Sequence, residues 1–475
     1  MAEHLLALDL GTTGVRAVVF DAAGESVGAA YARLSVTTPA PDRVEQDADE
    51  FLRRSLEVMR RALAEAGRDV RDLRALGIVT QRSSVVAWDA QTGRPLAPVI
   101  GWQDRRTLAR VLSLQQSGIP VNTLAACTKF EWLLQAVPEV AAAAAAGVLR
   151  LGTPDAWLAW ALSGGAVHVT DPSNAGTTGL YDAERGDWFD PALALFGQDR
   201  RWHPNVVASD AVVGEVDRRH LGAPVPLAAR AGDQQAACFA QGVHEEDDAK
   251  LTLGTSAMLD RCTGSTPAEA PQGAYALPLW RRVGRGDAFC VEGTVITAGA
   301  AVEWLLRTGV LESVEALDDL ATAGRPGVIF VPALAGLGTP YLADRVRGRL
   351  DGLGLDTERA DIVRGVVDGI AQRVADVADA LGVKGVLRVD GGLARSRRLV
   401  QTIADLTGLE VRVAADVETT ARGAAALAAA SPDVAGDALP DAATALCCVP
   451  ELPAADRDVR RGAWAVQLRA LLARP

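Results

Sequence analysis

The chain has 475 residues and a formal net charge of −12, and 49% of its residues are apolar. This length suggests two or three domains, because a domain averages roughly 150 residues. The negative charge argues against nucleic acid or an anionic membrane surface as a general partner, since both repel an acidic protein. No basic segment precedes the first apolar run, and the Ala-rich stretch 140–149 is too short to span a membrane. We therefore expect a cytoplasmic protein.

The six cysteines form no C-x-x-C pair, and the five histidines form no H-E-x-x-H motif. Most of the cysteines have apolar neighbours, so reduced and mostly buried thiols are expected. The spacing typical of a zinc site is absent from the sequence.

Two apolar runs around a glycine-rich turn open the chain. Residues 5–10 and 15–20 are predicted to form a pair of strands joined by the turn Gly11–Gly14, and 26–34 a third strand. Apolar residues at three- and four-residue spacing then predict a helix.

This helix covers 48–66, with Asp47 or Asp49 as its cap, and a short buried strand follows at 76–79. Strands that alternate with a helix in this way predict the α/β class.

A similar order returns in the second half of the chain. An apolar strand at 250–253 runs into Gly254-Thr255-Ser256, and another at 385–389 runs into Asp390-Gly391-Gly392. Two similar lobes are therefore indicated, with a boundary at the charged run 245–248, and we place the domains at 1–245 and 246–475. Helices are expected at 298–307, 361–381 and 419–429.

Three glycine-rich turns follow apolar strands, and each is a candidate phosphate site. Successive backbone N–H groups in such turns, with hydroxyls nearby, bind anions. In the first turn Thr12 and Thr13 supply hydroxyls and Arg16 a positive charge. Each glycine-rich turn by itself could be a tight turn without a ligand. The presence of three such turns favours a site that binds the polyphosphate of a nucleotide. A P-loop is excluded, because no lysine follows a G-x-x-x-x-G pattern.

Asp9 lies inside the first apolar strand, where an isolated buried carboxylate is costly. Mg²⁺ keeps several waters and takes one or two carboxylates, so Asp9 beside a phosphate turn is a candidate magnesium residue. The alternative is that Asp9 accepts N–H groups of the adjacent turn.

Three polar or aromatic stretches suggest an acceptor for phosphate. In "AGDQQAA" Asp233 could take a proton from an attacking hydroxyl, although a helix N-cap is the simpler interpretation. The polar cluster 80–84 follows the strand that ends at Val79, where α/β sheets bind ligands. Trp102 could form an apolar wall for a sugar or polyol, or could belong to the core.

Taken together, these stretches resemble the FGGY family of carbohydrate kinases, and within it the glycerol kinase branch. The similarity extends from Leu5 to about Ala429. The resemblance implies an α/β protein of two ribonuclease H-like domains of the actin and hexokinase type, with a catalytic cleft between them. It also implies ATP and Mg²⁺ as cofactors and a polyol or sugar as the acceptor. A homodimer is one assembly that we consider for the chain. The matching stretches are "ALDLGTTGVRAVVFD", "GIVTQRSSVVAWDAQTGRPL", "GWQDRRT", "GTPDAWLAWALSGGAVHVTDPSNAGTTGLYD", "AGDQQAACFAQG", "LGTS", "GVIFVPALAGLGTPY", "RGRLDGLG" and "LRVDGG".

By position, the resemblance implies that Asp233 is the general base and that Asp9 lies near Mg²⁺. The expected acceptor residues are Arg82, Ser83, Trp102, Asp233 and Gln234. The expected nucleotide residues are Thr12, Thr13, Arg16, Thr255, Gly299, Glu303, Gly392 and Ser396.

The sequence also departs from the glycerol kinase pattern. Ser83 replaces a Glu, Leu124 a Tyr and Met258 an aromatic residue on the acceptor side. Glu303 replaces a Gln and Ser396 an Asn on the nucleotide side, and these changes are mild. We therefore expect glycerol to be a poor acceptor and a four- or five-carbon polyol or ketose to be a better one.

Two other functions share the phosphate turns. An actin- or chaperone-like ATPase would need no acceptor residues such as Arg82 and Trp102. A sugar sensor without turnover would have no need of Asp9, Asp233 and Thr255, all of which are retained.

Overall fold

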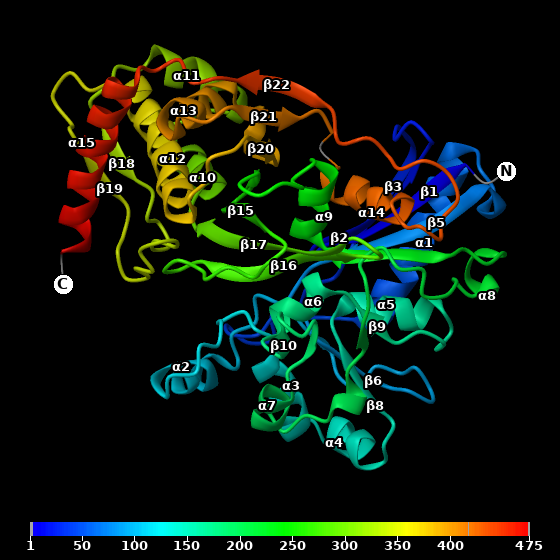
Figure 1. The fold of residues 1–475 in the computed structure, drawn as a ribbon. Helices are drawn as coiled ribbons and strands as arrows, with labels where there is room; N and C mark the ends of the chain where they lie inside the picture. Colours follow the sequence, from blue (N-terminus) through cyan, green and yellow to red (C-terminus); the bar gives the residue numbers. More distant parts are fainter. Residues whose placement is uncertain (1–2, 417, 474–475) are drawn as a thin grey trace. The chain divides into compact units, whose positions relative to one another are not determined.

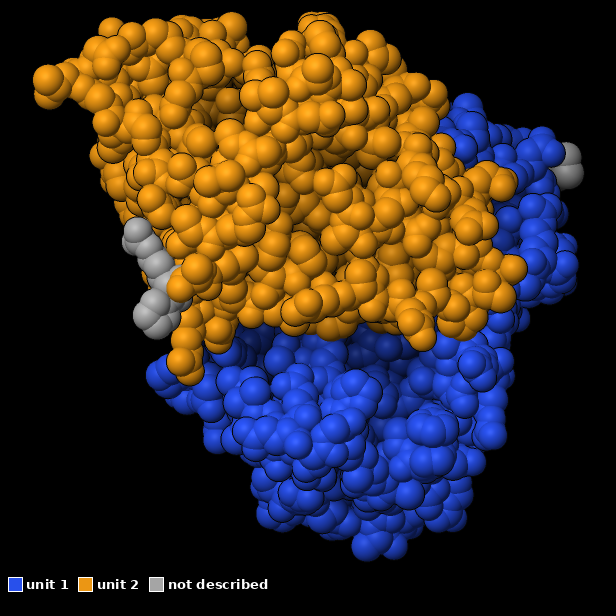
Figure 2. Space-filling model, turned by 60° about the vertical axis from the view of Figure 1, so that its left-hand side comes forward, with its two compact units in different colours: residues 1–240, 278–288, 418–441 blue, residues 241–277, 289–417, 442–475 orange. Residues whose placement is uncertain are grey.

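The computed structural model describes residues 3–416 and 418–473. The chain divides into two compact units, coloured separately in Figure 2: unit 1 contains Met1–Ala240, Pro278–Ala288 and Glu418–Asp441, and unit 2 contains Gln241–Leu277, Phe289–Val417 and Ala442–Pro475. These units differ from the two contiguous segments expected from the sequence, because 278–288 and 418–441 cluster with the first unit.

A five-stranded sheet forms the centre of unit 1, in the order β13-β5-β1-β2-β3. β1, β2 and β3 form an antiparallel meander, and β5 and β13 run parallel to β1. The strands cover His4–Leu10 (β1), Gly14–Phe20 (β2), Ser26–Arg33 (β3), Leu73–Thr80 (β5) and Leu227–Gly232 (β13). The predicted strands are confirmed, although β5 begins three residues earlier than expected.

Helices cover both faces of this sheet (Figure 1). On one face α1 (Ala48–Ala66) packs against β2 and β3, and Asp47 caps it by accepting the N–H of Asp49. On the other face α14 (Thr419–Ala429) packs against β1 and β5 and against α9 (Asp233–Ala240). The approach of α14 requires a glycine at position 77, because a Cβ there would lie 2.2 Å from the Ala424 carbonyl oxygen.

The remainder of unit 1 forms a second, smaller core around α3 and its neighbours. The remaining elements of unit 1, not all of which contribute to this second core, are β4 (Glu45–Gln46), β6 (Val86–Asp89), β7 (Val99–Ile100), α2 (Leu108–Gln116), α3 (Cys127–Ala136), α4 (Pro138–Ala145), β8 (Leu149–Gly152), α5 (Pro154–Leu162), β9 (Val169–Thr170), α6 (Pro172–Ala175), β10 (Tyr181–Asp182), β11 (Asp187–Trp188), α7 (Asp190–Leu195), β12 (Asn205–Val206) and α8 (Arg218–Leu221). Across 3–416 and 418–473, no helix combines the length and the apolar character that crossing a membrane requires.

Unit 2 repeats the topology of the first sheet. In the seven-stranded order β16-β17-β15-β14-β20-β21-β22, β14 and β15 are antiparallel, β15 and β17 are antiparallel, and β20 and β21 run parallel to β14. The expectation of two similar lobes therefore agrees with the strand order of the two sheets. The strands are β14 (Ala249–Leu253), β15 (Ala257–Gly264), β16 (Tyr275–Arg282), β17 (Gly286–Val295), β18 (Ile329–Val331), β19 (Arg349–Asp351), β20 (Leu387–Asp390), β21 (Val411–Ala414) and β22 (Thr444–Cys448), of which residues 278–288 in β16 and β17 cluster with unit 1.

The helices of unit 2 bury a long apolar core against this sheet. They are α10 (Gly299–Arg307), α11 (Leu317–Ala323), α12 (Arg359–Leu381), α13 (Arg397–Thr407) and α15 (Ala454–Leu472), and the three helices predicted from the sequence lie within two residues of α10, α12 and α14. All six cysteines are free, as expected.

Candidate active site

Asp9 and Arg16 are direct cross-strand partners in the β1–β2 hairpin. Burial raises the pKa of the Asp9 carboxyl to about 7, the charge of Asp233 adds to this rise, and Arg16 opposes it. The Arg16 guanidinium also forms an ion pair with Glu418, the residue before α14. Its charge is therefore shared between two carboxylates.

The first phosphate turn connects these two strands, and two side chains hold Thr12 at its centre. Gly11 N–H donates to the Gly14 carbonyl over 3.0 Å. The Thr12 carbonyl accepts from Gln46 Nε2 at 2.8 Å, and the Thr12 hydroxyl accepts from the Trp102 indole N–H at 2.9 Å. Thr13 is exposed. Thr12 is therefore fixed in place, whereas the Thr13 side chain faces solvent.

Asp233 is the first residue of α9, immediately after β13. Its Oδ1 accepts the N–H of Gln234 at 2.8 Å and lies 3.5 Å from Arg82 Nε. Arg82 follows β5, and Gly232 and Thr80 are register partners at the ends of these parallel strands, which is why the two side chains meet. A Cβ at Gly232 would lie 2.7 Å from Arg82 Cδ, so only glycine leaves room for this approach.

The end of β13 is held by a buried polar network that the sequence analysis did not identify. Gly232 N–H donates to the Ser173 hydroxyl at 2.8 Å, and that hydroxyl contacts the Asp171 carboxylate at 2.8 Å. Asp171 also accepts from Ser209 at 2.7 Å and from the side chain of Asn174 at 2.9 Å. The Asp-Pro-Ser sequence signals a helix N-cap, and Asp171 is indeed the N-cap of α6. The contact to Gly232 was not predictable from that pattern.

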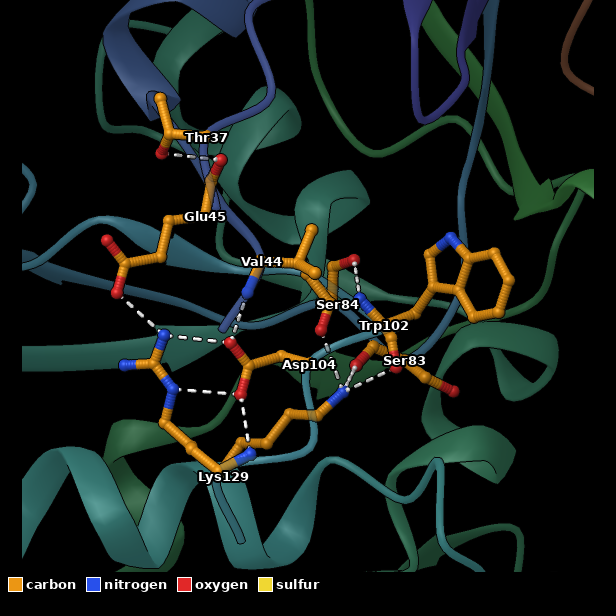
Figure 3. A network of polar contacts seen from close by, with 10 residues as sticks. Thr37, Val44, Glu45, Ser83, Ser84, Trp102, Asp104 and Lys129 are labelled. Carbon is orange, nitrogen blue, oxygen red and sulfur yellow. Dashed lines mark hydrogen bonds and ion pairs between the residues drawn. The ribbon is translucent and has the colours of Figure 1, made fainter. Parts of the chain in front are cut away.

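Ser83 and Trp102 lie in two neighbouring segments of unit 1 (Figure 3). Ser83 has a φ of 61°, which is unusual for a residue other than glycine. The Trp102 N–H donates to the Ser84 hydroxyl at 3.0 Å. The Nζ of Lys129, on α3, donates to the carbonyl oxygens of both Ser83 and Trp102. No function for Lys129 was predicted from the sequence, although a single lysine among mostly apolar residues is a signal.

Unit 2 brings a second set of the expected nucleotide residues together. Gly254 N–H donates to the Ser256 carbonyl at 2.9 Å, much as Gly11 does to Gly14 in the first turn. Gly299 N–H donates to the Gly254 carbonyl at 2.9 Å, and a Cβ at Gly299 would lie 2.6 Å from that oxygen. Gly391 has a φ of 93°, and a Cβ there would lie 2.5 Å from the Leu253 carbonyl oxygen. Thr255, Gly299 and the turn before Gly392 are therefore neighbours in the fold.

Two other expected nucleotide residues have different surroundings. Glu303 lies one turn along α10 from Gly299 and is exposed. Ser396 is buried and is the N-cap of α13, where its hydroxyl accepts the N–H of Leu399 at 3.1 Å and contacts Asp318. The Ser396 hydroxyl is therefore already engaged.

The two remaining substituted positions lie in different units. Leu124 precedes α3 in unit 1, and 37% of its surface is exposed. Met258 lies on β15 in unit 2, where its sulfur accepts from the Thr294 hydroxyl at 3.3 Å.

Among residues 3–416 and 418–473, no group of three or more His, Cys, Asp or Glu side chains could hold a metal ion. Mg²⁺ needs fewer protein ligands, because it retains most of its waters. The raised pKa of Asp9 reflects burial and a neighbouring like charge, both of which a divalent cation would offset. The residues present therefore fit a hydrated Mg²⁺ at Asp9.

Comparison with known proteins decides the family. Residues 4–240 match the N-terminal domain of the FGGY family of carbohydrate kinases, and residues 249–431 match its C-terminal domain. The chain belongs to the FGGY family of carbohydrate kinases. Its α/β two-domain fold, predicted from the sequence, is confirmed, and so is its relation to the glycerol kinase branch.

Two curated relatives and two solved structures illustrate how this FGGY kinase is related. It is 41% identical to a glycerol kinase of Bordetella parapertussis over 448 residues, which cover 90% of this chain and 88% of the relative. It is 40% identical to a glycerol kinase of Aromatoleum aromaticum over 444 residues, covering 90% and 89%. The crystal structure of Plasmodium falciparum glycerol kinase with ADP aligns with a TM-score of 0.94 at 25% identity, covering 99% of each chain. A xylulose kinase of Rhodospirillum rubrum shares the fold, with a TM-score of 0.85 at 22% identity and coverage of 99% and 100%.

Proposed function

We propose that this FGGY kinase transfers the γ-phosphate of ATP to a hydroxyl of a polyol or sugar, with Asp233 as the general base. The observation that supports this most directly is the Asp233 carboxylate at the start of α9, 3.5 Å from Arg82 Nε and close enough to Asp9 to raise its pKa. A carboxylate that is partly accessible and next to a cation can accept a hydroxyl proton as the oxygen attacks phosphorus.

The acceptor would be held by side chains of unit 1. Arg82 and Gln234 supply N–H donors for its hydroxyls, and Trp102 supplies an aromatic face for its carbon chain. Thr12, Thr13 and Arg16 in unit 1, and Thr255, Gly299, Glu303, Gly392 and Ser396 in unit 2, are the proposed nucleotide residues. The hydrogen bonds of Thr12 and the close approach of Gly299 to Gly254 support this for those two positions.

Asp9 would hold Mg²⁺ through its waters. Bound Mg²⁺ would neutralise the charge of the β- and γ-phosphates. The Asp9 carboxyl must be ionised to hold Mg²⁺. Because its pKa is raised, the ionised form near neutral pH depends on the bound cation to stabilise it.

For the acceptor, we infer a polyol or ketose of four or five carbons rather than glycerol. The curated relatives are named glycerol kinases. This chain nevertheless has Ser83, Leu124 and Met258 where the glycerol kinase pattern that it resembles has Glu, Tyr and an aromatic residue. Losing two polar partners weakens binding by about 1 kcal/mol or more each, or roughly 30-fold together. The smaller Ser83 side chain also leaves more space.

The test is steady-state kinetics with ATP and Mg²⁺ over glycerol, erythritol, xylitol and D-xylulose, with the Asp233→Asn variant in parallel. We expect turnover that requires an acceptor, the highest kcat/KM for one of the longer compounds, and a kcat reduced by roughly 10²–10⁴ in the variant. ATP hydrolysis that no acceptor stimulates would favour an ATPase, and binding without turnover a sensor. A variant that keeps more than half of the normal kcat would remove Asp233 from the mechanism.

Two further proposals concern the context of the enzyme. We infer a cytoplasmic enzyme, which fractionation of the source cells would test. A homodimer is the assembly we propose, and light scattering of the purified protein would measure its mass.

A further inference from the structure

Lys129 is a buried cation whose three N–H groups are matched by three carbonyl oxygens. It lies on α3 and is 1% exposed. Its Nζ donates to the carbonyl oxygens of Ser83 at 3.0 Å, Gly101 at 3.0 Å and Trp102 at 3.2 Å (Figure 3). An ammonium group has three donors and no acceptor, so this arrangement uses it fully.

The three carbonyls belong to two separate segments of unit 1. One segment follows β5 and contains Ser83, and the other follows β7 and contains Gly101 and Trp102. Ser83 and Trp102 are both residues to which we assign the acceptor. Ser83 also has a backbone conformation that few side chains adopt freely, and such conformations persist where surrounding contacts hold them.

The helix that carries Lys129 is itself anchored beside these segments. The Thr107 and Thr128 hydroxyls lie 2.9 Å apart, and Arg110 contacts Glu131 through two bonds of 2.9 and 3.0 Å. Next to Trp102, the Asp104 carboxylate accepts the N–H of Val44 at 2.7 Å and is paired with Arg106. The ammonium group is therefore held on a rigid support.

We propose that Lys129 is a positioning residue that sets the spacing of Ser83 and Trp102 and thereby the affinity for the acceptor. This inference rests on the proposed function. Lys129 contacts only backbone atoms in the bonds described above, so its contribution is geometric: it neither exchanges a proton with the acceptor nor contacts the nucleotide. A misplacement of about 1 Å in a binding group can cost on the order of 10²-fold in activity.

The first test compares Lys129→Met with Lys250→Met. Met has a similar length but no donor, and Lys250 is an equally buried lysine, in β14 of unit 2, 3.7 Å from Asp260. We expect Lys129→Met to raise the KM of the best acceptor among glycerol, erythritol, xylitol and D-xylulose by roughly 10- to 100-fold. The KM of ATP and kcat should change by less than about threefold, and Lys250→Met should leave the acceptor KM unchanged. Equal effects of Lys129→Met on all three constants would overturn the proposal.

A second measurement needs no variant of Lys129 and no turnover. The chain contains three lysines, Lys129, Lys250 and Lys384, so protein labelled with ¹³C at lysine Cε gives three side-chain NMR signals. Lys250→Met and Lys384→Arg assign two of them. Saturation with the same acceptor should shift the Lys129 signal and leave that of the exposed Lys384 in place.

A Lys129 signal that does not move while the wild-type enzyme turns over would overturn this inference alone. A wild-type enzyme that phosphorylates none of the four compounds would instead overturn the proposed function.

Discussion

The indole N–H of Trp102 donates a hydrogen bond to the hydroxyl of Thr12 over 2.9 Å. This bond joins a proposed acceptor residue to the first phosphate turn within unit 1. The Thr12 carbonyl is held separately by Gln46 Nε2. A change at either end of the indole bond should therefore affect the binding of both substrates.

We predict that Trp102→Phe and Thr12→Val are not additive. Phe keeps a ring but lacks the N–H donor, and Val lacks the hydroxyl acceptor, so either change alone breaks the same bond. The coupling between them in kcat/KM for ATP should be about 1 kcal/mol, or roughly fivefold. The control is Trp202→Phe, at a partly buried tryptophan elsewhere in unit 1. It should change neither the KM of ATP nor the KM of the acceptor. Fully additive effects of the two variants would show that the bond does not connect the sites.

Asp9→Asn should stabilise the protein while it removes activity. The folded-state pKa of about 7 lies above the ordinary aspartate pKa of 3.8, so the carboxyl of Asp9 reduces stability as pH rises from about 4 through 7. An amide removes this cost, and we expect a Tm gain of roughly 2–4 °C at pH 8 and a smaller gain at pH 5. Thermal scans at both pH values measure the change in Tm, and titrations of kcat with Mg²⁺ measure the loss of activity. A variant that melts earlier but keeps its Mg²⁺ dependence would make Asp9 a structural residue.

Ser83→Glu should shift the acceptor preference toward glycerol. The carboxylate restores a hydrogen-bond acceptor and fills space, which favours a shorter substrate. We expect the ratio of kcat/KM for glycerol to that for xylitol to rise by about tenfold or more. Ser83→Ala, which adds neither charge nor volume, is the matched control and should leave this ratio near that of the wild type. If Ser83→Glu also leaves it unchanged, position 83 does not select the acceptor.

The stability of unit 1 should fall in mild acid because of His203. Its side chain is buried, and within 3–416 and 418–473 neither of its ring nitrogens has a hydrogen-bond partner. Burial, together with the charge of the nearby His168, lowers the pKa of His203 to about 3.

In the unfolded chain the His203 imidazole binds a proton below about pH 6.5, whereas in the folded protein it stays neutral until about pH 3. The free energy of unfolding therefore decreases as pH falls from 6.5 toward 3. At pH 5 the loss from this group is about 2 kcal/mol. His203→Phe keeps a ring beside Phe130 and Trp188 and should flatten the decline in Tm between pH 7 and 5. An equally steep decline in the variant would assign the acid sensitivity to other groups.

The sequence by itself determined the strands β1, β2, β3, β5, β14 and β20, the helices α1, α10, α12 and α14, and the three glycine-rich turns. Residues 5–10, 15–20 and 48–66 have clear local periodicity, and their structures as β1, β2 and α1 agree with it. Such elements depend on the order of apolar and polar residues over one or two turns, which any reader of the chain can see. The succession of motifs also indicated the family.

Only the tertiary structure decided which partners these residues meet. Arg16 pairs with Glu418, 402 residues away, and Gly232 is held by Ser173, 59 residues away. Lys129 belongs to none of the elements predicted from the sequence, yet it holds carbonyls from two distant segments. No periodicity encodes these contacts, because they arise when buried backbone groups from remote segments must find hydrogen-bond partners in one folded core.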